Sequence, residues 1–206
     1  MFFQIHSVGH TTDRLHKINE VVEMLRTSFN NAFQPYQRLC IDKSLLLYKG
    51  RLSFKQYIPS KRSRFGIKSF LLCDCKTGYI QDIIIYCGAS TTVATEYQYI
   101  GKPGNIIMSL LQSFLNKGHT VYLDNWFSSP TLFILLHEKG TNACGTVQRR
   151  RKDMPKISDK LKKGEAVFRS SENLLAMKWS DRKEFYMLST IHTAEFAEVP
   201  KKVKKK

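Results

Sequence analysis

The fold can be worked out from one stretch, His119-Thr120-Val121-Tyr122-Leu123-Asp124-Asn125-Trp126-Phe127. Its first half is short and apolar, which predicts a strand, and an acidic residue stands where that strand ends. Apolar residues with a helical period precede it, up to Gly118, and residues 130–139 predict a second helix that Gly140 closes. Residues 141–148 predict a further strand. A strand–helix–strand order of this kind indicates a sheet with parallel pairs.

Upstream of this stretch, the sequence predicts strands that follow one another without intervening helices. They cover residues 38–49, 53–58, 66–74 and 79–87, and the spacing is typical of an antiparallel meander. An amphipathic helix precedes them, with apolar residues from Leu15 to Phe33, Thr12 or Asp13 as its cap, and Pro35 beyond its end. The fold class is therefore α/β, a mixed sheet with flanking helices.

Downstream of Arg149 the chain changes character. A basic, polar linker containing Pro155 leads to two apolar segments, residues 165–177 and 183–190, which predict strands of a small β unit. The last residues, Pro200-Lys-Lys-Val-Lys-Lys-Lys206, are of low complexity, and we expect them to lack fixed structure.

Positive charge is concentrated along the chain. The 33 basic and 17 acidic residues give a formal net charge of +16. Residues 43–68 hold eight basic side chains and no acidic one, and residues 149–163 hold eight basic and two acidic ones. Clustered charge of this sign favours a polyanionic partner, most simply DNA, with an anionic membrane surface or a solvated basic face as the alternatives. We expect DNA contacts from Lys61, Arg62, Arg64, Arg149, Arg150, Arg151 and Lys152. No apolar run is long enough for a membrane span, and of the candidate partners we expect DNA and not a membrane.

Two acidic residues are candidates for chemistry, because both lie in or beside apolar strands. Asp42 follows Ile41 in the first predicted strand, and Asp124 ends the strand described above. A carboxylate among apolar residues is costly unless it is paired, hydrogen-bonded or metal-bound. Each residue alone could be a strand-end Asp that caps a turn or pairs with a basic side chain. Together they would suit Mg²⁺-dependent phosphoryl chemistry. Trp126 could stack on a base or fill the corner between strand and helix.

Several strings in the chain resemble the piggyBac-type transposases and the host genes derived from them. They are Cys40-Ile41-Asp42, Gly50-Arg51, Tyr57-Ile58-Pro59-Ser60-Lys61, Arg64-Phe65-Gly66-Ile67-Lys68, Thr77-Gly78-Tyr79, Asp124-Asn125-Trp126-Phe127 and Gly145-Thr146-Val147. Order and spacing agree from about Thr12 to Thr193. The resemblance implies an RNase H-like fold with a β-rich insertion. It implies domains at 1–36 (N-terminal helix of the core), 37–148 (catalytic core), 149–193 (partial β-rich insertion) and 194–206 (basic tail).

The resemblance also implies a function. In this family three aspartates bind Mg²⁺ and promote cleavage and transfer of DNA strands, and Asp42 and Asp124 match the first two. We find no match to the third aspartate in this sequence, and the glutamate that usually follows the first is Lys43. A cation at that place opposes metal binding. We therefore expect a DNA-binding, transposase-derived protein without transposition activity. The alternatives are an active Mg²⁺-dependent transposase or nuclease completed by another chain, and a non-functional gene fragment. A homodimer is possible by the resemblance, and the lysine-rich tail predicts nuclear localisation.

Overall fold

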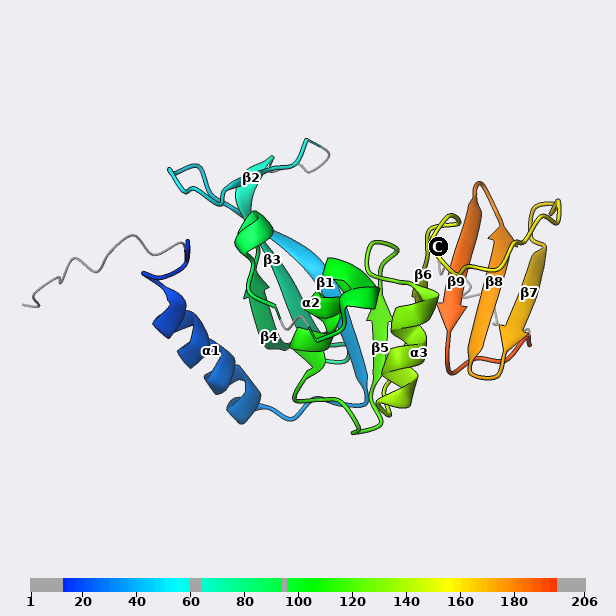
Figure 1. Cartoon of the computed structure of the whole chain (residues 1–206), viewed down its shortest axis with the longest axis horizontal. Helices are drawn as coiled ribbons and strands as arrows, with labels where there is room; N and C mark the ends of the chain where they lie inside the picture. Colours follow the sequence, from blue (N-terminus) through cyan, green and yellow to red (C-terminus); the bar gives the residue numbers. More distant parts are fainter. Residues whose placement is uncertain (1–12, 60–63, 94–95, 196–206) are drawn as a thin grey trace, which may run out of the picture.

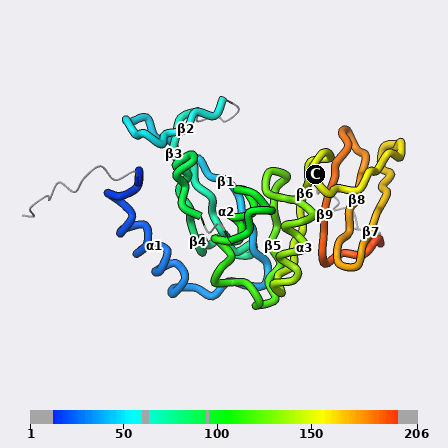
Figure 2. The backbone as a smooth tube through the Cα atoms, in the orientation of Figure 1, coloured from blue at the N-terminus to red at the C-terminus, as the bar shows by residue number. Residues whose placement is uncertain are grey.

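A computed structural model describes residues 13–59, 64–93 and 96–195. Lys61, Arg62 and the lysine-rich residues 200–206, which carry part of the expected DNA contacts and the expected nuclear signal, lie outside the described residues. Figure 1 shows one extended sheet with helices in front of it, and Figure 2 shows the chain passing from a helix at one edge to three strands at the other. The predicted α/β class, a mixed sheet with flanking helices, is confirmed.

The centre of the sheet has the strand order β4-β3-β1-β5-β6. These strands are β1 (Arg38–Leu47), β3 (Phe65–Asp74), β4 (Ile80–Ile85), β5 (Thr120–Leu123) and β6 (Asn142–Thr146). The first three form the predicted antiparallel meander, whereas β5 and β6 run parallel to β1. The segment 53–58 contributes only β2 (Gln56–Tyr57), which pairs with the start of β3. It is shorter than predicted because Lys55 closes a turn onto Leu52 and Phe54 is buried.

Two helices cover the face of the sheet that looks toward the viewer in Figure 1. They are α2 (Gly101–Leu111) and α3 (Pro130–Glu138), and Ser129 caps α3 by accepting a hydrogen bond from the backbone N–H of Leu132. Two short 3-10 turns, η1 (Gly88–Ser90) and η2 (Gln98–Ile100), lead into α2. The buried core is formed by α2, α3 and the strand residues that face them: Leu39, Ile41, Phe70, Leu72, Val121 and Leu123. Within the described part of the chain, no helix has the length and apolar character of a membrane span.

The sheet continues beyond β6 through three antiparallel strands, β9 (Glu184–Ser189), β8 (Leu174–Ser180) and β7 (Ala166–Ser171). The sequence predicted a single strand over residues 165–177, and this was wrong. Glu172 and Asn173 form a turn that divides the segment into β7 and β8. Asn is a common turn residue, but a two-residue turn between apolar stretches gives a weak signal. Because β9 pairs with β6, the C-terminal strands extend the central sheet.

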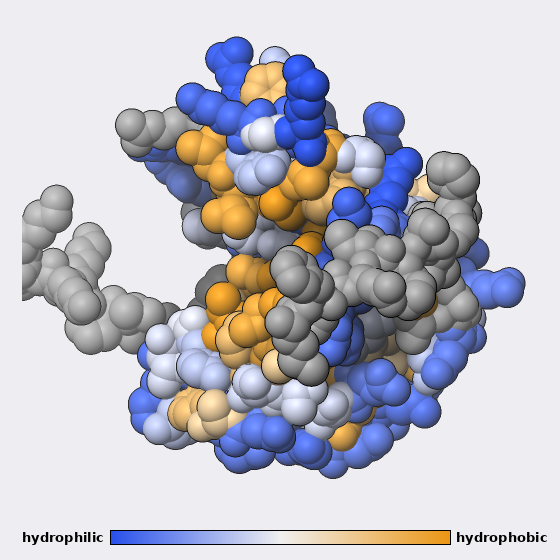
Figure 3. Space-filling view, turned by 90° about the vertical axis from the view of Figure 1, so that its left-hand side faces the viewer, coloured by the Kyte–Doolittle hydropathy of each residue, from blue (hydrophilic) through white to orange (hydrophobic). Residues whose placement is uncertain are grey.

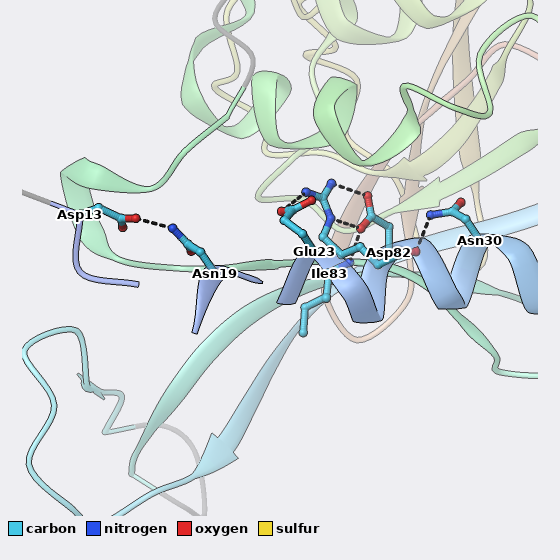
Figure 4. Close-up of polar contacts among 7 residues, drawn as sticks. Asp13, Asn19, Glu23, Asn30, Asp82 and Ile83 are labelled. Atoms are coloured by element: carbon cyan, nitrogen blue, oxygen red, sulfur yellow. Dashed lines mark hydrogen bonds and ion pairs between the residues drawn. The ribbon is translucent and has the colours of Figure 1, made fainter. Parts of the chain in front are cut away.

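The helix α1 (Asn19–Ala32) lies at the other edge of the sheet, beside β4. It starts later than predicted, and Asp13 accepts a hydrogen bond from the Leu15 N–H in the turn before it. None of its residues is buried. The helix is held by Arg26, whose Nε and Nη2 lie 2.6 and 2.9 Å from the two carboxylate oxygens of Asp82 on β4 (Figure 4).

Hydrophobic side chains are exposed at the ends of β1 and β2 and at the start of β3. Figure 3 views the molecule from this side and shows hydrophobic surface on both sides of a hollow. The exposed residues at these strand ends are Leu46, Leu47, Tyr48, Tyr57 and Phe65.

Candidate functional site

The pairing of β1 with β5 places the two candidate aspartates next to each other along the sheet. The strands are parallel, and Ile41 is the register partner of Leu123. Asp42 and Asp124 directly follow these two residues, so they lie at the same level of neighbouring strands. In the conformation of the structure they differ in surroundings. Asp42 is exposed, and its Oδ1 accepts a hydrogen bond from the backbone N–H of Lys43. The burial cost expected for this carboxylate is therefore absent.

Asp124 begins a tight turn at the end of β5. Its Oδ1 accepts a hydrogen bond from the Trp126 N–H at 3.0 Å, and its backbone carbonyl accepts from the N–H groups of Phe127 and Ser128. An Asp that binds the backbone two residues further on is a common way to start a turn. This arrangement leaves Oδ2 free of the backbone contacts and directed at Lys43.

Lys43 and Asp124 form an ion pair, with Nζ 2.6 Å from Oδ2. The side chains are 27% and 37% exposed, so both are partly withdrawn from water. The Lys43 ammonium also lies 5.2 Å from the ring centre of Trp126 and 5.5 Å from that of Phe127. Aromatic faces attract cations electrostatically. The rings are themselves fixed, since Trp126 stacks on Phe70 with ring centres 5.7 Å apart. Trp126 thus fills the corner behind β5, one of the two roles considered for it.

Two further lysines point to the same place. Lys68 on β3 has its Nζ 5.3 Å from the Trp126 ring centre and 4.4 Å from that of Tyr86. Lys102, at the start of α2, lies 5.5 Å from the same Tyr86 ring and donates a hydrogen bond to the carbonyl of Gly88. Burial, followed by repulsion from Lys43 and Lys102, lowers the pKa of Lys68. The positive charges of Lys43 and Lys102 are therefore close enough to Lys68 to act on it electrostatically.

We refer to Lys43, Lys68 and Lys102 together as the lysine cluster. Sequence analysis identified the charge at Lys43 but missed the other two residues. Lys68 lies two residues before the buried Phe70 in β3, so both side chains lie on the same face of the strand. A lysine on the core-facing side of a predicted strand is the feature of the sequence that could have identified it. Lys102 could be recognised only once η2 and α2 place it beside Tyr86.

The residues around Asp124 do not fit the Mg²⁺ site that the family resemblance implies. Mg²⁺ is bound through carboxylate oxygens and water, and here both oxygens of Asp124 are engaged, Oδ2 by Lys43 at 2.6 Å and Oδ1 by the Trp126 N–H at 3.0 Å. No group of three or more His, Cys, Asp or Glu side chains within residues 13–59, 64–93 and 96–195 is arranged to hold a metal ion. The local charge is dominated by ammonium groups.

The expected DNA contacts are placed as follows. Arg64 is exposed and precedes β3, and Arg149, Arg150 and Lys152 are exposed in the segment after β6. Arg151 is half-buried, and its Nη2 donates hydrogen bonds to the carbonyls of Asn125 and Trp126 at 2.7 and 3.1 Å. Its guanidinium thus supports the turn that carries Asp124, a role that its place in an arginine run did not indicate.

A groove of about 490 Å³ adjoins this turn. Its lining includes Asn125, the neighbour of Asp124, together with Arg149, Lys183 and Glu184, whose carboxylate is paired with Lys178 at 2.8 Å. Phe185 lies on the groove and stacks with Trp179 at 5.8 Å between ring centres, and both rings are partly exposed. Positive charge beside exposed rings is a combination that suits nucleic acid.

Comparisons with known proteins match this chain over nearly its whole length. The family model described as Transposase IS4 matches residues 4–206. The human PiggyBac transposable element-derived protein 2 is 22% identical over 181 residues, which are 82% of this chain and 30% of that protein. A cryo-EM structure of a piggyBac transposase synaptic complex with hairpin DNA superposes with a TM-score of 0.79 at 25% identity, over 91% of this chain and 40% of that chain. The chain thus spans less than half the length of either relative.

Proposed function

The chain belongs to the transposase IS4 family of piggyBac type, and on this premise we propose that it binds DNA without catalysing transposition. The fold is that of piggyBac transposase, and the chain is a piggyBac transposase-related protein. The proposal goes further in two respects: this chain retains the DNA contact, and its own residues do not supply a metal-dependent reaction.

The observation that carries the proposal is the Lys43–Asp124 ion pair. Of the three aspartates of the family, the second matches Asp124, and here its free oxygen is engaged by an ammonium. A metal ion would have to displace a cation that is already hydrogen-bonded and seated against two aromatic rings. Repulsion between that cation and an incoming Mg²⁺ adds to this cost.

DNA binding is supported by the distribution of charge. Arg64, Arg149, Arg150 and Lys152 are exposed, and the groove beside Asn125 has Arg149 and Lys183 in its wall. Contacts of lysine and arginine with phosphates release counterions, so affinity depends strongly on salt. About four phosphate contacts predict roughly a hundredfold loss of affinity between about 50 and about 200 mM salt.

The binding test uses a labelled duplex and fluorescence anisotropy in EDTA at several salt concentrations. The double variant Arg149→Gln/Arg150→Gln should weaken binding and flatten the salt dependence, because each lost phosphate contact removes about 0.9 from the slope. The matched control is Lys117→Gln/Lys139→Gln, which removes the same charge near the opposite end of β5. Wild-type affinity that does not change with salt would contradict the proposal.

A second candidate is a Mg²⁺-dependent transposase or nuclease that another chain completes. The observation in its favour is the register that places Asp42 and Asp124 on neighbouring strands. A cleavage assay with Mg²⁺ on piggyBac-type terminal repeats separates the two proposals, since only the second predicts nicked product, and Asp124→Asn should abolish it.

A homodimer, inferred from the resemblance, is to be tested by light scattering in the presence of DNA. The third candidate, a fragment without function, predicts no cooperative unfolding transition.

We also propose nuclear import through Pro200-Lys-Lys-Val-Lys-Lys-Lys206. Short lysine-rich strings of this kind serve as import signals. Fusing these residues to a large cytoplasmic reporter tests the proposal directly, and a version with the lysines replaced by glutamine is the control. A reporter that stays in the cytoplasm would show that the tail adds only charge.

A further inference from the structure

Three ammonium groups converge on one short stretch of surface at the carboxyl end of β5. Lys43 and Lys68 both approach the Trp126 ring, at 5.2 and 5.3 Å from its centre. Lys68 and Lys102 both approach the Tyr86 ring, at 4.4 and 5.5 Å from its centre. The lysine cluster therefore comes from β1, β3 and the first turn of α2, and two aromatic side chains hold its members in place. A ring attracts an ammonium without removing its charge.

The charge of the lysine cluster is only partly balanced. Asp124 neutralises Lys43, while Lys102 donates to a neutral carbonyl. Among the described residues Lys68 forms no ion pair, and its neighbours are aromatic rings and other lysines. Like charges held this close repel one another, and partial burial makes the repulsion stronger. An arrangement of this kind is relieved by an anion that can contact all three groups.

The start of α2 adds to the same field. Its first turn contains Lys102 and no acidic residue, and no side chain caps it. Backbone N–H groups at a helix start favour negative charge. Burial first, and then the neighbouring Lys43 and Lys102, lower the pKa of Lys68, so its charged form is disfavoured in the present surroundings.

We propose that Lys43, Lys68 and Lys102 form a binding site for one phosphate group of nucleic acid, and that this site works without a divalent cation. The proposal deepens the proposed function and rests on DNA binding by this chain. Phosphate offers several acceptor oxygens to three ammonium groups, and charge-assisted hydrogen bonds of this kind are short and strong. The site lies next to the turn of Asp124, where the family resemblance would place the reacting phosphate. The lysine cluster would thus hold DNA at the place where the family cleaves it.

The test compares single lysine variants in duplex binding, measured by anisotropy with EDTA present. Lys68→Gln should weaken binding about tenfold, because a hydrogen bond to a charged group is lost. Lys68→Arg keeps the charge and should retain most of the affinity. Lys117→Gln is the matched control: Lys117 also packs on an aromatic ring, 5.7 Å from the centre of Phe114, but it precedes β5 at the opposite end. Its affinity should change less than about twofold.

A second arm uses inorganic phosphate as the probe. Phosphate, compared with chloride at equal ionic strength, should raise the melting temperature of the wild type and of Lys117→Gln more than that of Lys68→Gln, which keeps only the general stabilisation by an excluded anion. If Lys68→Gln binds duplex as Lys117→Gln does, the proposal is overturned, and DNA binding that still depends on Arg149 and Arg150 would leave the proposed function intact. If phosphate stabilises the wild type through Lys68 but no duplex binds, the nucleic-acid occupant and the proposed function both fail.

Discussion

Replacing Gly145 by alanine should displace Asp124, although the substitution lies on the neighbouring strand β6. Gly145 on β6 is the register partner of Leu123 on β5, the residue before Asp124. A Cβ at Gly145 would lie 2.1 Å from the carbonyl oxygen of Leu123 and 3.0 Å from its carbonyl carbon. Both atoms belong to the backbone of a buried strand, so no side chain can turn away. To restore normal contact the strands must separate by roughly 1 Å.

This separation has a cost that can be estimated. Overpacking a filled interior costs about 1–3 kcal/mol, and weakened pairing of β5 with β6 places Gly145→Ala near the upper end, about 3 kcal/mol. For a protein of this size, that corresponds to a fall in melting temperature of roughly 6–12 °C. Differential scanning fluorimetry or circular dichroism measures the fall directly, and tryptophan emission reports on Trp126, beyond the end of β5, together with Trp179.

The control is Gly164→Ala, which adds the same methyl group where no atom lies within 4 Å. Its φ of +91° makes alanine strained there, so a fall of about 1 kcal/mol is expected. The reasoning fails if Gly145→Ala melts within about 2 °C of the wild type, or no lower than Gly164→Ala.

Three further predictions concern carboxylates and their partners. Burial opposes ionisation of Asp74, but hydrogen bonds, led by those from Thr77, outweigh it and lower the pKa of this carboxyl group. The ionised Asp74 therefore stabilises the folded protein above pH 3.8, and this contribution is lost as the pH falls through the lowered pKa. Asp74→Asn should accordingly make the free energy of unfolding less dependent on pH in the acid range. Arg26→Ala should cost about 2 kcal/mol, because it leaves the buried Asp82 carboxylate unpaired, and hydrogen exchange should show faster opening of α1. Lys43→Glu should give the protein millimolar affinity for Mn²⁺, seen as a metal-dependent rise in melting temperature; an equal response of the wild type would contradict it.

The strands and helices that carry the site could be predicted because their signals are local. The apolar stretch ending at Asp124 became β5, and Gly140, at a φ of +57°, follows the end of α3 as predicted. The helix before β5 was predicted to continue up to Gly118, and this was wrong, because α2 ends at Leu111 and turns follow it. The choice of Asp42 and Asp124 rested on their apolar strands and on the family resemblance, and the structure places them beside each other because β1 and β5 pair with Ile41 opposite Leu123. These features depend on period and on turn residues, which a single sequence contains.

The remaining features depend on where long side chains reach, and the sequence does not record that. Arg151 was grouped with its neighbours by charge, yet its guanidinium binds the carbonyls of Asn125 and Trp126. The link between Arg26 and Asp82 joins residues 56 positions apart. The lysine cluster unites residues from β1, β3 and α2 around two rings, and only the tertiary structure brings them together.

Lys43 stands where the family resemblance implies a glutamate, and the two side chains would give the site opposite electrostatic character. A glutamate there would add a carboxylate beside Asp124 and favour cations. The lysine instead neutralises the charge of Asp124, and the positive charges of Lys68 and Lys102 are left without this carboxylate as a partner. Under the proposal, a site that in the family binds a divalent cation, and through it a phosphate, binds the phosphate directly in this chain. The proposal therefore separates affinity for DNA from metal-dependent cleavage, because ammonium groups can hold a phosphate but cannot take the place of two metal ions on the attacking and leaving oxygens.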